Sequence, residues 1–292
     1  MLRKPIRNND VQRRTKCRGS FYYYFVSIRK MDTIKNPYYS LVRYIVIVTG
    51  QSRYNPKWIN FIIQSFFTFI IVSFITGQIT GAIKLLDNID AFLVCIPPTC
   101  YSSISAIIFL NNKLKVKQIN VVLSKIQEDW NSLLSKYEVE ILHKYGRRCN
   151  SYIKLFYVGF FGHANVYVLS HVIPLMIKFF KNSHEPSELL FPLDFGIDTE
   201  KYFYLIAIHG YLSAYVCTLA FVNGDTLLFM FLEHACGIFE IMRYKLSTAI
   251  NETSKSVNND TFQKNLQREI KICVSMHRKV LLFVYFYYDL LH

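Results

Sequence analysis

Four long stretches of this chain contain no Asp, Glu, Lys or Arg, and they constrain the fold more than any other feature. They are residues 58–83, 91–112, 155–177 and 202–224. At about 1.5 Å per residue, a helix over each stretch is about 30 Å long or longer, enough to cross the hydrocarbon core of a bilayer. Helices buried in soluble proteins seldom contain apolar runs of this length. We therefore predict four membrane-spanning helices.

The overall composition agrees with this prediction. Hydrophobic residues make up 52% of the chain and aromatic residues 16%, which is too apolar for an ordinary soluble protein. The predicted fold class is all-α: a polytopic membrane helix bundle with a cytoplasmic N-terminus, four complete spans and the start of a fifth.

The positions of the cations predict the orientation. The net charge of +14 could indicate a nucleic-acid partner, but nearly all Lys and Arg lie before residue 58, between 112 and 155, and after 224. The gaps at 84–90 and 178–201 are acidic instead. Lys and Arg near the ends of spans are retained in the cytoplasm. We therefore expect the three basic regions inside, the two acidic gaps outside, membrane lipid as a partner and no nucleic acid.

The two ends of the chain differ from its middle. Residues 1–57 form a cytoplasmic N-terminal segment, of which 1–30 are expected to be disordered or to lie upstream of a natural start at Met31. Residues 58–292 form the transmembrane domain. Its last apolar run, 280–292, is only about 18 Å long as a helix and cannot cross a bilayer. We expect the chain to stop inside this fifth span and to be a piece of a larger protein.

Several helical features outside or within the spans are also predicted. Residues 36–50 suggest a short amphipathic helix on the inner membrane surface. Pro97 and Pro98 should kink the second span. Apolar residues recur at helical spacing over 119–137, which we expect to continue a span into the cytoplasm. The fourth span should likewise continue inward beyond Gly224. A small-residue pair, Gly77 and Gly81, permits close helix contact.

The chain carries no motif typical of an enzyme. It has no metalloprotease, Cys-x-x-Cys, P-loop or Rossmann pattern, and no paired carboxylates in its spans that could act as acid and base. We expect no cofactor, no metal and no catalytic residue. His234 and Cys236 are interpreted as packing residues rather than metal ligands. The seven cysteines fall in the spans or on the predicted cytoplasmic side, so no disulfide framework is expected.

Three stretches resemble the insect odorant receptors, of the type expanded in ants, bees and wasps. The first is Asn-Pro-Tyr-Tyr-Ser-Leu-Val-Arg at 36–43 with Gly50, and the second is the predicted outer loop at 193–204. The third is Asp-Thr-Leu-Leu from Asp225, followed by His-Ala-Cys-Gly-Ile-Phe-Glu-Ile at 234–241 and echoed at 273–277. The resemblance covers most of the chain from Met31 onward.

The resemblance implies a seven-helix fold with the N-terminus inside, which the charge pattern predicts independently. It implies an odorant-binding subunit that joins a shared co-receptor in a hetero-oligomeric, ligand-gated cation channel in the plasma membrane of a sensory dendrite. The expected ligand is a small volatile odorant. The pore helices would follow residue 292, so this chain alone should not conduct.

A volatile ligand has few hydrogen-bonding groups, so its site should be apolar and aromatic with a few polar groups. Polar side chains within spans also tend to face a cavity or another helix. On depth and residue type, the candidate ligand-binding residues are Cys95, Thr99, Tyr167, His171, Tyr204, Ile208 and Tyr211.

Two other receptor classes remain open at this point. A gustatory receptor would share the fold and the topology. A G-protein-coupled receptor would require the N-terminus outside and the basic residues in the opposite set of gaps between the spans. A transporter is disfavoured, because the spans carry no buried charge and the chain shows no internal repeat.

The orientation can be tested directly. An epitope at the N-terminus should be inaccessible to antibody on intact cells and become accessible after permeabilisation. The sequons at Asn251 and Asn259 should stay without glycan, because they lie in a predicted cytoplasmic segment. Glycan on either asparagine, or labelling of intact cells, would reverse the orientation.

Overall fold

A computed structural model describes residues 37–52, 55–132, 135–181, 189–253 and 259–291. These residues form helices and no strand. The predicted segment 1–30 lies outside the described residues. In chain order the elements are η1 (Pro37–Tyr39), α2 (Ser40–Val48), α3 (Lys57–Lys84), α4 (Ile89–Leu114), α5 (Val116–Ser132), α6 (Lys136–Phe180), α7 (Phe203–Thr253) and α8 (Asn259–Leu291).

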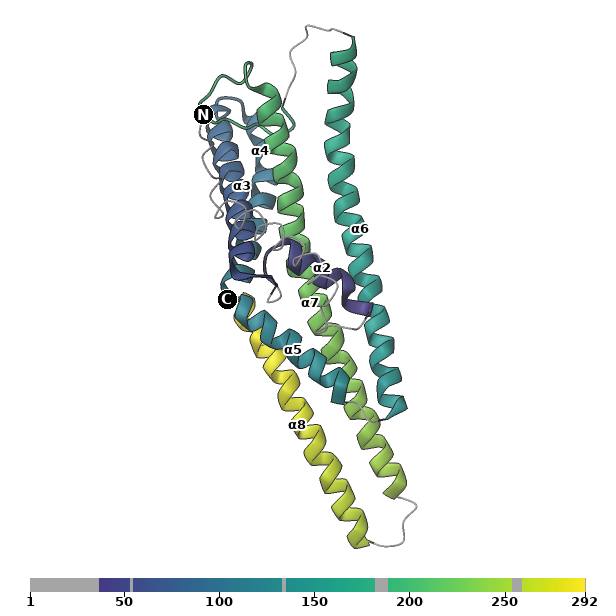
Figure 1. Cartoon of the computed structure of the whole chain (residues 1–292). Helices are drawn as coiled ribbons and strands as arrows, with labels where there is room; N and C mark the ends of the chain where they lie inside the picture. Colours follow the sequence, from purple (N-terminus) through teal and green to yellow (C-terminus); the bar gives the residue numbers. More distant parts are fainter. Residues whose placement is uncertain (1–36, 53–54, 133–134, 182–188, 254–258, 292) are drawn as a thin grey trace, which may run out of the picture.

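Helix α7 is the centre of the bundle, because it contacts α2, α3, α4, α6 and α8. Figure 1 shows α3 and α4 on one side of α7 and α6 on the other, with α5 and α8 beside the second half of α7. Four helices, α3, α4, α6 and α7, are long and apolar enough to cross a membrane. The predicted all-α membrane helix bundle is confirmed, and each predicted complete span lies within one of these helices, apart from Tyr202 just before α7.

Helices α6 and α7 are much longer than a bilayer requires. They contain 45 and 51 residues, whereas about 20 residues cross the hydrocarbon core. Their excess lies at one end of the bundle together with α5 and α8, which we call the charged end. The opposite end carries the loop at 189–202, which we call the loop end. The predicted continuation of the fourth span beyond Gly224 is thus present in α7.

Ion pairs join the helices of the charged end. Arg148 of α6 lies 2.8 Å from Glu233 of α7, and Lys245 of α7 lies 2.5 Å from Glu138 of α6. Asp129 of α5 accepts from His234 at 3.1 Å. The carboxylates of Asp129, Glu138 and Glu233 are each nearly buried, and a buried charge is tolerated when it is paired and hydrogen-bonded. This end is therefore a packed polar and apolar domain outside the lipid-spanning region.

The short helix α2 corrects one prediction from the sequence. It forms where the amphipathic pattern predicts it, but its apolar face is not left for the membrane surface. Val42 and Val46 are buried in a cluster with side chains of α5, α6 and α7, and Ile45 is also fully buried. Figure 1 shows α2 lying across α6 and α7. Burial against the protein removes the apolar surface that would otherwise seek lipid.

The helix expected at 119–137 is a separate element rather than a continuation of a span. Helix α4 ends at Leu114 and α5 begins at Val116, with Lys115 between them. Helix α5 lies at an angle to α4 (Figure 1), and its Ile119, Val122 and Ile126 pack in the cluster that also contains Val42 and Val46 of α2. Helix α4 itself runs through Pro97 and Pro98 without interruption.

The glycine pair of α3 contacts the loop at 189–202 and not another helix, which corrects a second prediction. A Cβ at Gly81 would lie 2.0 Å from the carbonyl oxygen of Pro192, and one at Gly77 would lie 2.7 Å from the ring of Phe195. The backbone N–H of Asp194 donates to the Gly77 carbonyl at 3.0 Å. Because Gly77 and Gly81 have no side chains, the loop backbone can reach the surface of α3 at these two positions.

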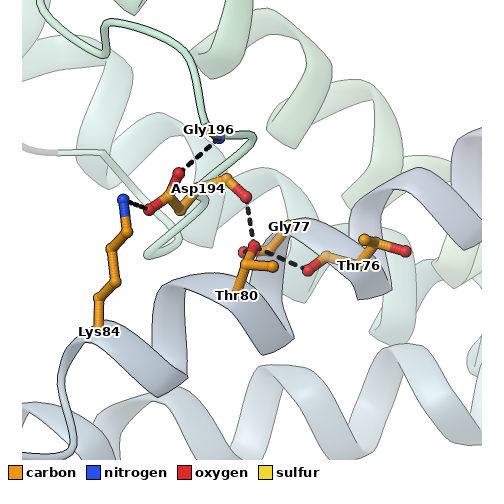
Figure 2. A network of polar contacts seen from close by, with 6 residues as sticks. All are labelled: Thr76, Gly77, Thr80, Lys84, Asp194 and Gly196. Atoms are coloured by element: carbon orange, nitrogen blue, oxygen red, sulfur yellow. Dashed lines mark hydrogen bonds and ion pairs between the residues drawn. The ribbon is translucent and has the colours of Figure 1, made fainter.

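Side chains hold the same loop segment (Figure 2). The Thr80 hydroxyl contacts the carbonyl oxygen of Asp194, and the Asp194 carboxylate pairs with Lys84. Lys84 and the backbone N–H of Gly196 hold the pKa of this carboxyl below its usual value. A carboxyl group whose pKa is lower in the folded state than in the unfolded state contributes stability at pH values above its unfolded-state pKa. This contribution is lost as the pH falls through the folded-state pKa. The loop attachment should therefore persist at neutral and mildly acidic pH.

Replacing Gly81 tests whether the loop depends on this close approach. Gly81→Ala should lower the free energy of unfolding by about 1–3 kcal/mol, because the new methyl group meets a backbone oxygen. Gly162→Ala is the matched control, since no atom lies within 4 Å of a Cβ there. The control should be neutral or stabilising by up to about 1 kcal/mol through helix propensity. Thermal unfolding followed by circular dichroism would decide, and equal midpoints for the two variants would contradict the contact.

Candidate functional site

One face of α7 carries a stripe of large side chains near the loop end. Tyr204, Ile208, Tyr211 and Tyr215 follow one another at spacings of four, three and four residues, which places them on one face of a helix. Two of them bind α6, so this face is turned toward α6. We call it the α7 stripe.

Two hydrogen bonds connect the α7 stripe to α6. The hydroxyl of Tyr211 lies 2.7 Å from Nδ1 of His171, and the hydroxyl of Tyr215 donates to Oδ1 of Asn165 at 2.7 Å. Polar groups in a membrane span have no water to bind, so they are satisfied by a neighbouring helix. These bonds set the register of α6 against α7, which run in opposite directions.

Toward the loop end, the two helices no longer cover each other. Tyr204 and Ile208 of α7 are 59% and 62% exposed. Both side chains are mainly apolar. The His171–Tyr211 bond is therefore the polar boundary of an uncovered apolar region on α7.

On the other side of these bonds, an aromatic layer joins three helices. The ring of Phe221 on α7 lies 5.1 Å from Phe160 of α6 and 5.7 Å from Tyr101 of α4. The Tyr101 hydroxyl also donates to Thr218 of α7 at 3.1 Å. Stacked and tilted rings at these distances pack favourably. The layer closes the space between α4, α6 and α7 on the side nearer the charged end.

Cys95 and Thr99 lie on a different face of α4 from the aromatic layer. Their hydrogen bonds stay within α4: the Cys95 thiol donates to Ala91, and the Thr99 hydroxyl donates to the Cys95 carbonyl at 2.7 Å. Ser102, on the same face, donates to Gln78 of α3 at 2.6 Å. Pro97 and Pro98 lack N–H groups, which removes the usual donors to the carbonyls of Leu93 and Val94, and the Cys95 and Thr99 side chains donate to other carbonyls. The structure thus separates these two candidates from the residues of α6 and α7.

Tyr167 lies on α6 one turn from His171 and is 41% exposed. Its ring lies 5.7 Å from Phe191 of the loop at 189–202, and Phe191 in turn packs against Phe74 of α3 at 5.1 Å. Of the seven predicted residues, the structure therefore brings His171 and Tyr211 into direct contact. It places Tyr167, Tyr204 and Ile208 around them.

The sequence reasoning missed Tyr101, Phe160, Phe191 and Phe221. Each is an aromatic residue among many in the spans, and no local spacing indicates which ring faces which helix. The only available signal was aromatic content combined with depth. The pairing of α4 with α7 through Tyr101 and Thr218, which selects these rings, requires the tertiary structure.

Among the described residues, no three His, Cys, Asp or Glu side chains come together in a way that could hold a metal ion. The cysteines of this part of the chain are free. His234 is buried against Asp129, and Ala235 and Ile238 next to it pack against Leu142. The segment at 234–241 therefore packs helices together, as the sequence suggested.

These features define a multi-pass, all-helical membrane protein with polar contacts between its spans and a packed domain at one end. A family model described as 7tm Odorant receptor matches residues 88–291, which is more than half of the chain. The chain belongs to the odorant receptor family, and the resemblance seen in its sequence is confirmed. No curated protein matches the chain. Family membership supports a role in olfactory reception, as a receptor or channel rather than an enzyme.

The contribution of the His171–Tyr211 bond can be measured with matched substitutions. Tyr211→Phe removes the hydroxyl and should lower the free energy of unfolding by about 0.6 kcal/mol and by at most about 1.7 kcal/mol, the mean and the maximum for hydrogen bonds between membrane helices. Tyr204→Phe is the control, since the structure gives its hydroxyl no partner among the described residues. Thermal unfolding in detergent would compare them. A Tyr204→Phe loss as large as that of Tyr211→Phe would contradict this assignment.

Proposed function

We propose that the chain is an odorant-binding subunit of a heteromeric, ligand-gated cation channel in the plasma membrane, with its N-terminus in the cytoplasm. The observation that carries the proposal is the family match over residues 88–291. The distribution of cations along the chain supports the orientation. Assembly with an odorant receptor co-receptor follows from what the family resemblance implies.

The proposed ligand site lies between α6 and α7 at the loop end. The ligand contacts Tyr167, His171, Tyr204, Ile208 and Tyr211. Three of these side chains are exposed in the structure, so they have apolar surface available to bury. Binding of a volatile molecule would gain about 25 cal/mol of free energy for each Å² of its apolar surface that is removed from water. The His171–Tyr211 pair supplies the polar groups that could orient it.

The aromatic layer supports this location. Phe160 and Phe221 close the space on the side of the charged end, so a ligand entering from the loop end would stop at the level of Tyr211 and Tyr215. Cys95 and Thr99 bond within α4 and are not part of the proposed site.

Ligand binding can be tested without a channel current. The chain in lipid nanodiscs should show saturation-transfer NMR signals from some members of a panel of volatile alcohols, esters and ketones. Ile208→Ala should weaken this binding about fourfold for each of the removed carbons that the ligand covers, because burying one methyl or methylene group contributes about 0.8 kcal/mol. Ile62→Ala, a similarly exposed isoleucine of α3, should leave it unchanged.

Two outcomes would count against the proposal. If no volatile in the panel gives a signal, the chain has no odorant site of its own. If Ile62→Ala and Ile208→Ala weaken binding equally, the molecules partition around the helices and do not occupy the space between α6 and α7. Co-purification with a tagged co-receptor from the same cells would test the hetero-oligomer separately.

A further inference from the structure

A second site lies on α3, away from the α7 stripe. A groove of about 430 Å³ runs along this helix. One face of α3 and one lysine of α4 line the groove. The lining residues are Ser65, Thr68, Phe69, Val72, Ser73 and Lys113. None of these residues belongs to the proposed odorant site.

Lys113 lies at the end of α4 and is the charged residue of the groove. Its ammonium reaches the Thr68 hydroxyl at 3.4 Å, and Thr68 uses its own hydrogen on the Gln64 carbonyl at 2.7 Å. An ammonium has three donors, so the structure leaves Lys113 with donors to spare and no carboxylate among the described residues. Lys84, Lys245 and Lys279 each pair with a carboxylate.

Ser65 provides an independent second observation. Thr68, Ser73, Thr76 and Thr80 of α3 all donate to a carbonyl of their own helix. Ser65 is the exception: the structure gives its hydroxyl no hydrogen bond among the described residues. An unused hydroxyl donor and an ammonium with unused donors therefore line the same end of one groove. Both would be satisfied by the oxygens of an anion.

The depth of these groups in the membrane indicates where that anion comes from. Ser65 lies about 28 Å along α3 from Lys84, whose partner Asp194 is in the outer loop, and this distance is close to the thickness of the hydrocarbon core. Lys113 follows Ala91 by about 33 Å along α4. Both residues thus lie near the opposite boundary of the hydrocarbon core, next to the lipid head groups.

The rest of the groove is apolar and continues toward the middle of the membrane. Phe69 and Val72 are 68% and 57% exposed and follow Ser65 along the same stripe of α3. The groove is therefore amphipathic: its polar end is at the membrane surface and its apolar end is in the hydrocarbon region. This order of groups matches a molecule with a charged head and a hydrocarbon chain.

We propose that this groove binds one anionic glycerophospholipid. The phosphate accepts hydrogen bonds from Lys113 and Ser65, and an acyl chain lies along Phe69 and Val72. An anionic head group fits better than a choline head group, because choline would add a second positive charge beside Lys113 and the nearby Lys115. Bound lipid would neutralise Lys113 and hold α3 against α4.

The test is lipid retention by the whole 292-residue chain. Native mass spectrometry of the protein released from phosphatidylcholine nanodiscs containing phosphatidylglycerol should show one phosphatidylglycerol retained in preference to phosphatidylcholine. Lys113→Ala should weaken this binding about fivefold, the factor expected for one basic residue at an anionic lipid surface. Ser65→Ala, which removes one hydroxyl, should weaken it about threefold. Lys113→Arg should retain it.

Lys117→Ala is the matched control, because Lys117 is an exposed cation just beyond α4 that does not line the groove. The proposal is wrong if Lys117→Ala and Lys113→Ala lose lipid equally, or if neither Lys113→Ala nor Ser65→Ala loses any. Displacement by inorganic phosphate would show a site for a free anion. A change of oligomeric state with unchanged lipid would show that a second copy occupies the groove. If Lys113→Ala does not fold, lipid retention by Ser65→Ala alone tests the proposal, and retention equal to that of the unaltered chain contradicts it.

Discussion

The structure depends on one constraint: within a bilayer there is no water to satisfy a backbone N–H or C=O group. The chain meets it with helices that satisfy their own backbone over α3, α4, α6 and α7. Polar side chains in these spans have the same requirement, and they meet it with carbonyls of their own helix or with a side chain of another helix. The bonds of His171 to Tyr211, Tyr215 to Asn165, and Ser102 to Gln78 are therefore the contacts that set how the spans pack.

Charged residues are arranged by the same constraint. Those that pair across helices, such as Arg148 with Glu233 and Lys245 with Glu138, lie at the charged end, where α6 and α7 continue beyond the length a membrane needs. At the loop end, Lys84 and Asp194 attach the loop at 189–202 to α3. Lys113 lies at neither end of the bundle but near a boundary of the hydrocarbon core, where its unused donors are available for the proposed lipid phosphate.

The sequence was sufficient for features that depend on one segment at a time. Charge-free length predicts the spans, and apolar spacing predicts α2, α5 and the long continuation of α7. It was insufficient where two segments meet. Gly77 and Gly81 looked like a helix contact, yet the loop at Pro192 occupies them. Cys95 and Thr99 have the right depth, but the rotation of α4 turns Tyr101, and not these two residues, toward Phe221. Depth can be counted along a helix, whereas rotation about its axis is set by the partners it packs against.

The central claim is that these helices lie across a lipid bilayer. It is tested most directly by nitroxide labels placed one at a time along the exposed face of α3, at Ile62, Val72 and Ile79, in the chain reconstituted into vesicles. Collision with molecular oxygen should be greatest at Val72 and collision with a water-soluble nickel complex least there, because oxygen concentrates in the hydrocarbon core. High nickel accessibility at all three positions would contradict the account.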